Sequence, residues 1–169
     1  MTLGVVLGLL MSLSVIIPIV IIWQTAGSKS STTSSPSSST VAGLSSSSLI
    51  VSSEIGTCDS YFCENKLYFF SNMTITALSL VITVQRTANS TYSGAYSSYS
   101  PTINSINNIT SSQIIYQFFI QTGQLPAGNY TCVGQYNLLN VNHATSADTY
   151  SISTTNICGM TSSATGNFP

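Results

Sequence analysis

The first 28 residues of the chain carry no charged side chain, and this segment constrains the fold more than any other part of the sequence. From Met1 to Trp23 the run is almost continuously apolar, and the exceptions are few: Thr2, Gly4, Gly8, Ser12, Ser14 and Pro18. Such a segment must be buried in lipid, in a signal-peptide channel, or against copies of itself. A helix of about 25 residues is about 37 Å long and can cross a bilayer core of about 30 Å.

Small residues recur every four positions in this segment, at Gly4, Gly8 and Ser12. On a helix they share one face, where a second helix can approach closely. Pro18 removes one backbone donor, so a kink is expected there. We therefore interpret residues 1–27 as a hydrophobic helix that mediates polymerisation.

Residues 28–48 read SKSSTTSSPSSSTVAGLSSSS and form a separate region. This composition cannot bury enough apolar surface to fold alone. A Ser/Thr/Pro run is also a natural place for O-glycans. We interpret 28–48 as a Ser/Thr-rich glycosylated linker.

Charged residues make up 4% of the chain, with three cations and four acids, whereas soluble proteins average about 25%. Three cations cannot form a basic patch, so no nucleic-acid partner is expected. Solubility must come from another source, and four acceptor sequons suit an exported glycoprotein. The predicted N-glycosylation sites are Asn72, Asn89, Asn108 and Asn129.

The four cysteines are Cys58, Cys63, Cys132 and Cys158. An even number in an exported domain predicts two disulfides, and the sequence does not choose among the three possible pairings. A metal site is disfavoured, because Cys58 and Cys63 have no second close pair and His143 has no ligand partner nearby.

Residues 49–169 follow a period of two that predicts strands. Thr74–Val84, Ile114–Ile120 and Tyr130–Tyr136 each place alternate apolar residues on one face. Turns are expected at Ser93-Gly94, at Ser100-Pro101 and between Leu125 and Asn129. The predicted fold class is thus α+β: a long N-terminal hydrophobic helix, a linker, and an all-β antiparallel Ig-like sandwich.

One local signature supports the sandwich. Tyr130 lies two residues before Cys132 and follows a Pro-Ala-Gly-Asn turn, which is the arrangement of the tyrosine corner in immunoglobulin-like domains. It would also suit a bond from Cys58 or Cys63 to Cys132, although the core tryptophan of such domains is absent. Simple alternation of aromatic residues along a strand is the other explanation.

The sequence predicts no catalytic residue, no metal and no cofactor apart from covalent glycans. His143 lies in a polar stretch and is interpreted as a solvated loop residue rather than a general base. Glu54, Asp59 and Glu64 are interpreted as ordinary exposed acids. The stretch Thr91–Tyr99 is interpreted as an exposed loop or edge hairpin, with an adhesive or sugar-contacting surface as the less favoured alternative.

In its organisation the chain resembles mature archaeal type IV pilins, and it is most similar to the heavily glycosylated adhesive pilins of thermoacidophilic archaea. The likeness rests on the uncharged segment from Met1 to about Ala26, the Ser/Thr-rich neck and the sequon-bearing β domain. Val5 stands where bacterial relatives carry an acid, in agreement with the archaeal pattern.

The resemblance implies that Met1 is a mature N-terminus, left by a prepilin peptidase that removes a basic leader. It further implies a membrane-inserted precursor, the pilus assembly machinery as partner, and a final homo-oligomeric filament outside the cell that serves adhesion. Close packing of N-terminal helices through Gly4, Gly8, Ser12 and the kink at Pro18 would form the filament core. The alternatives are a membrane-anchored, adhesin-like binding module, another surface filament, or a viral coat protein; an enzyme is expected least.

Overall fold

The computed structural model describes residues 49–87 and 90–169, which form a two-sheet β-sandwich. The predicted helix 1–27, with its packing residues Gly4, Gly8, Ser12 and Pro18, lies outside the described residues, as do the linker 28–48 and Asn89. Nine strands and one short 3₁₀ turn, η1 (Thr145–Ala147), make up the described part.

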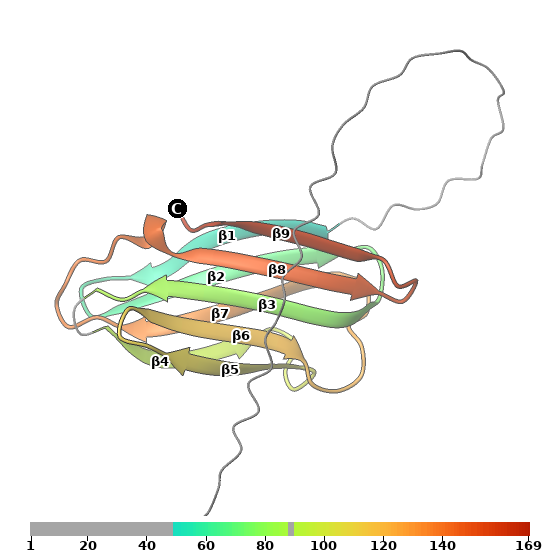
Figure 1. Cartoon of the computed structure of the whole chain (residues 1–169), viewed down its shortest axis with the longest axis horizontal. Coiled ribbons are helices and arrows are strands. Elements are labelled where there is room, and N and C mark those ends of the chain that lie inside the picture. Colours follow the sequence, from blue (N-terminus) through green and yellow to red (C-terminus); the bar gives the residue numbers. More distant parts are fainter. Residues whose placement is uncertain (1–48, 88–89) are drawn as a thin grey trace, which may run out of the picture. The chain divides into compact units, whose positions relative to one another are not determined.

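Four strands form the first sheet, in the order β1 (Leu49–Cys58), β2 (Phe62–Ser71), β7 (Gly128–Asn137) and β4 (Thr91–Ser97). The second sheet has the order β5 (Ile103–Ile109), β6 (Gln113–Ile120), β3 (Ile75–Gln85), β8 (Thr149–Asn156) and β9 (Thr161–Asn167). Every pairing is antiparallel. Figure 1 shows the second sheet in front of the first, with β1 beside β9 along one side and β4 beside β5 along the other.

The core lies between the sheets and follows from the alternation of the strands. In β2 every second residue is buried, and β3, β6 and β7 contribute in the same way. The largest fully buried side chains include Leu67, Phe69, Leu80, Ile82, Ile114, Tyr116, Phe118 and Tyr136. Because a strand turns successive side chains to opposite faces, the period-two pattern of the sequence is enough to separate core from surface.

The predicted class α+β is wrong for the described part of the chain. Residues 49–87 and 90–169 are all-β and contain no α-helix, so nothing in them supplies the helical component. Within these same residues no helix is long and apolar enough to span a bilayer. The period-two segments do form strands, as β3, β6 and β7.

One turn prediction is also wrong. Ser93 and Gly94 lie inside β4, where the register against β7 shifts between Tyr92 and Gly94. A glycine at such a bulge allows the strand to continue where the sequence predicts a turn. The stretch from Thr91 is therefore an edge strand, in keeping with an exposed edge hairpin.

The tyrosine corner forms as the sequence predicts. The hydroxyl of buried Tyr130 donates a hydrogen bond to the carbonyl oxygen of Pro126, four residues upstream. Its ring stacks on Phe69 with centroids 5.2 Å apart, and it forms a T-shaped contact with the Tyr99 ring, with centroids 5.6 Å apart. The corner therefore ties the loop before β7 to the core.

We expect Tyr130→Phe to lower the free energy of unfolding by about 1 kcal/mol, because it removes one hydrogen bond and keeps the ring. Urea denaturation followed by circular dichroism measures the change. Tyr61→Phe is the control, since Tyr61 is 63% exposed and should change stability by less than about 0.5 kcal/mol. Equal effects of the two substitutions would contradict a structural role for the corner.

Candidate functional site

The ionisable side chains of the described domain are mostly engaged in pairs or hydrogen bonds. Lys66 Nζ lies 3.2 Å from Glu64 Oε2, and Gln135 donates to the other oxygen of Glu64 at 2.8 Å. Burial by itself would raise the pKa of Glu64, but the hydrogen bonds from Gln135 and Lys66 outweigh it and leave that pKa below its usual value. Arg86 donates to the carbonyl oxygens of Ser90 and Thr110. Across residues 49–87 and 90–169, no group of three potential ligands gathers as a metal site.

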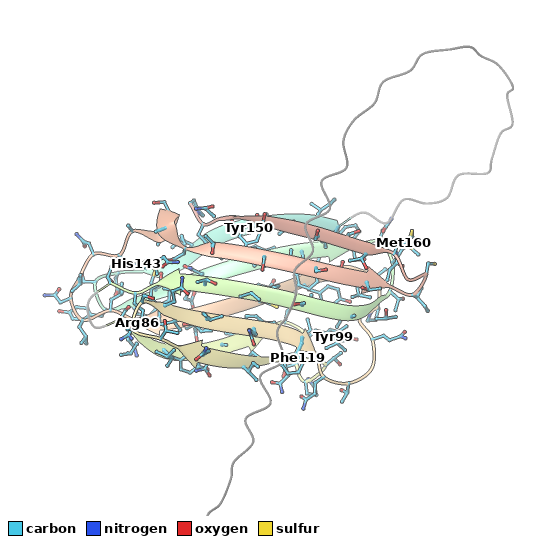
Figure 2. The ribbon with its side chains drawn as sticks, in the orientation of Figure 1. Arg86, Tyr99, Phe119, His143, Tyr150 and Met160 are labelled. Carbon is cyan, nitrogen blue, oxygen red and sulfur yellow. A yellow bond between two sulfur atoms is a disulfide. The ribbon has the colours of Figure 1, made fainter. Side chains whose placement is uncertain are left out.

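His143 and Asp148 form a buried pair at one end of the sandwich, and here the sequence interpretation is wrong. The His143 side chain is 1% exposed rather than solvated, and its Nε2 lies 2.8 Å from Asp148 Oδ2. Figure 2 shows His143 at the same end as Arg86, opposite the end that holds Met160. The imidazole also meets the Tyr136 ring edge-on, with centroids 5.1 Å apart.

Asp148 is the acceptor that holds this cluster together. Its Oδ2 accepts from Asn65 Nδ2 at 2.8 Å and from the Tyr136 hydroxyl at 3.3 Å, and its Oδ1 accepts from the backbone N–H of Gln85 at 2.8 Å. Burial, and then the charge of Asp148, raise the pKa of Tyr136, so the phenol keeps its proton and donates. Because Asp148 is fully buried, the cluster is closed to substrates and its evident role is to join β2, β3, β7 and the β7–β8 connection.

The prediction of two disulfides is wrong. Cys58 and Cys63 are register partners that close the β1–β2 hairpin and are bonded to each other. Cys132 is free and buried on β7, where burial raises the pKa of its thiol. Cys158 is free and exposed in the β8–β9 turn. The bond suggested between the hairpin cysteines and Cys132 does not form, because Cys132 pairs in register with Leu67, in the interior of the sheet.

The three described sequons occupy different settings on the surface. Asn72 lies in the bend between β2 and β3, Asn108 lies near the end of edge strand β5, and Asn129 lies near the start of β7. All three residues are exposed. Their occupancy by glycans stays a prediction, but the fold leaves each asparagine accessible.

An uncharged groove lies on the first sheet beside Asn129. It has a volume of about 280 Å³. Its lining comes from β1, β2 and β7: Ile50, Ser52, Tyr68, Phe69, Phe70, Asn129, Tyr130 and Thr131. Ile50 is 61% exposed there. Burial, and then the nearby Glu54 carboxylate, raise the pKa of Tyr68, so its hydroxyl stays protonated at the groove. The arrangement suits binding of a neutral ligand.

Sequence reasoning found the sequon at Asn129 but missed the groove beside it. Phe70 and Asn129 are far apart in the chain and become direct neighbours only because β2 pairs with β7. The aromatic run Tyr68–Phe70 at the end of an alternating strand was the available signal, since Tyr68 and Phe70 fall on the solvent side of the alternation.

The fold and the groove define a charge-poor β-sandwich with a neutral, partly aromatic surface site. No protein-family model matches the chain, and no curated protein matches it. Among solved structures, the major pilin subunit BcpA of Bacillus cereus is 7% identical with a TM-score of 0.44, over 71% of this chain and 39% of that one. This chain therefore spans well under half of that pilin.

Two further solved structures show similarity at the same low level. A non-cellulosomal cohesin from the hyperthermophilic archaeon Archaeoglobus fulgidus is 8% identical with a TM-score of 0.43, over 70% of this chain and 91% of that one. The GH20 exo-β-N-acetylglucosaminidase of Vibrio harveyi is 14% identical with a TM-score of 0.41, over 72% of this chain and 18% of that one. These likenesses are too weak to assign a function.

Proposed function

We propose that this protein is a structural subunit of an extracellular filament of the archaeal type IV pilus class, which serves surface adhesion. The β-sandwich would form the outer surface of the filament, and the charge-free segment before residue 28 would supply contacts between subunits. One observation carries the proposal: a sandwich with three exposed sequons follows a long segment that has no charge to expose.

The proposed mechanism is physical and not enzymatic. The apolar segment is first held in the membrane as part of a precursor that a prepilin peptidase processes. Assembly then exchanges its lipid contacts for contacts with the same segment of neighbouring copies, so shape matters more than hydrophobicity alone. The hydroxyl-rich tract 28–48 separates this interior from the glycosylated sandwiches.

Electron microscopy of the protein purified from an archaeal host tests the proposal. Long filaments with sandwiches on the outside are expected. Particles the size of single subunits in detergent would contradict it and favour a membrane-anchored binding module instead. The neutral groove beside Asn129 is the observation that gives this second candidate its support.

A charge in the apolar segment should block assembly. We expect Val15→Asp to abolish filaments, because an unpartnered carboxylate buried between subunits costs several kcal/mol. The melting temperature of the sandwich should stay unchanged, as measured by calorimetry. Val15→Leu is the matched control and should still assemble, whereas normal filaments from Val15→Asp would refute burial of this segment.

A further inference from the structure

The groove on the first sheet has the character of a site for one or two sugar rings. Its volume of about 280 Å³ lies just below the range of roughly 300–1,000 Å³ typical of small-molecule pockets. Its lining has aromatic faces, one aliphatic side chain and several hydroxyls, and no charged side chain. A pyranose ring matches this lining, because it presents C–H bonds on its faces and hydroxyls around its rim.

The sequon Asn129-Tyr-Thr131 is part of the wall of this groove. Asn129 is the direct register partner of Phe70, and Thr131 is the partner of Tyr68. Side chains that face each other across an antiparallel pair are about 5 Å apart at Cβ, which is within reach of the first sugar on an asparagine. On the other side of β2, Ile50 pairs with Phe70 and extends the apolar floor.

We propose that Asn129 carries an N-linked glycan whose first sugar is seated in this groove, on Phe70 and Ile50. The inference rests on the export and glycosylation that the proposed function includes. In the transfer step, Asn129 Nδ2 bonds to the anomeric carbon of an oligosaccharide linked to a polyisoprenyl phosphate. The anomeric C–O bond breaks, the lipid phosphate leaves with the electron pair, and the amide loses one proton.

The asparagines of the other two described sequons, Asn72 and Asn108, do not line the groove. Asn108 faces Ile115 across the β5–β6 pair, which offers an aliphatic contact rather than an aromatic face. Asn72 lies in the bend between β2 and β3. A glycan at Asn129 should therefore stabilise the fold, whereas one at Asn108 should chiefly add solubility.

The experiment compares the full chain with Asn129→Gln and with the matched control Asn108→Gln, all produced in an archaeal host that performs N-glycosylation. Glycopeptide mass spectrometry should find a glycan on Asn129 in the wild-type chain. Calorimetry should show Asn129→Gln melting about 3–5 °C lower, and Asn108→Gln within about 1 °C of wild type. A bare Asn129 on a chain glycosylated elsewhere, or equal shifts for both variants, would overturn the proposal.

Two further measurements separate seating of the glycan from other effects of the substitution. In chains from a bacterial host without N-glycosylation, Asn129→Gln should leave the melting temperature unchanged. In glycosylated chains, Phe70→Thr should remove most of the shift caused by Asn129→Gln, because the aromatic contact is already lost. A shift of the same size in unglycosylated chains, or in the Phe70→Thr background, would refute the seating.

Filament formation is scored independently by microscopy. Filaments with a bare Asn129 would refute this inference and leave the proposed function standing. A glycan seated on Phe70 in a protein that forms no filaments would refute the proposed function and leave this inference standing.

Discussion

Replacing Asp148 by alanine is expected to lower the free energy of unfolding by about 3–5 kcal/mol, because it removes the shared acceptor of a buried polar cluster. The carboxylate accepts from Asn65, Tyr136 and the backbone N–H of Gln85, and it lies against His143. Alanine would leave the Asn65 amide and the Gln85 N–H without this acceptor, whereas the Tyr136 hydroxyl could still donate to Asn65 Oδ1 at 3.3 Å. Each unpaired buried group costs about 1–3 kcal/mol. Urea denaturation followed by circular dichroism gives the difference directly.

A second carboxylate provides the matched control for this prediction. Asp59 Oδ1 accepts from the backbone N–H groups of Tyr61 and Phe62, but Asp59 is exposed in the β1–β2 turn. Water can replace it there, so Asp59→Ala should cost about 1 kcal/mol or less. If Asp148→Ala lowered the free energy of unfolding no more than Asp59→Ala does, the buried cluster would stabilise the fold no more than an exposed turn does.

Gly134→Ala is expected to lower the free energy of unfolding by about 2–3 kcal/mol through overpacking. A Cβ at Gly134 would lie 2.8 Å from Cδ2 of the Tyr116 ring, which reaches across from the second sheet. Tyr116 is fully buried, and its hydroxyl donates to the carbonyl oxygen of Gln135 at 2.5 Å, so the ring cannot retreat. The sheets must then separate locally, or the ring must lose that hydrogen bond.

The same strand supplies the control. The nearest atom to a Cβ at Gly128 would be the Tyr130 hydroxyl oxygen at 3.8 Å, so Gly128→Ala should cost nothing measurable. Combining Gly134→Ala with Tyr116→Leu should recover part of the loss relative to the sum of the single changes, because the clash is shared. If the losses in unfolding free energy simply added, the cost of Gly134→Ala would not come from a clash with the Tyr116 ring.

Local sequence predicted three of the nine described strands, β3, β6 and β7, and the side that each turns to the core. Alternating residues in β3, β6 and β7 needed only the geometry of a strand to assign them inside or outside. The tyrosine corner was equally local, because Tyr130 reaches only four residues back to Pro126. Interactions of this range can be read from spacing alone.

The tertiary structure alone decided the partners of these strands, and with them the sites. The buried setting of His143 depends on its contact with Tyr136 of β7 and on Asp148, which Asn65 of β2 and Gln85 of β3 hold in place, so its loop sequence resembled an exposed one. The disulfide followed hairpin register, which left Cys132 and Cys158 free. Phe70 meets Asn129 only through the β2–β7 pairing. A sequence pattern shows the periodicity of a single strand. Which strands become neighbours depends on packing across the whole sandwich.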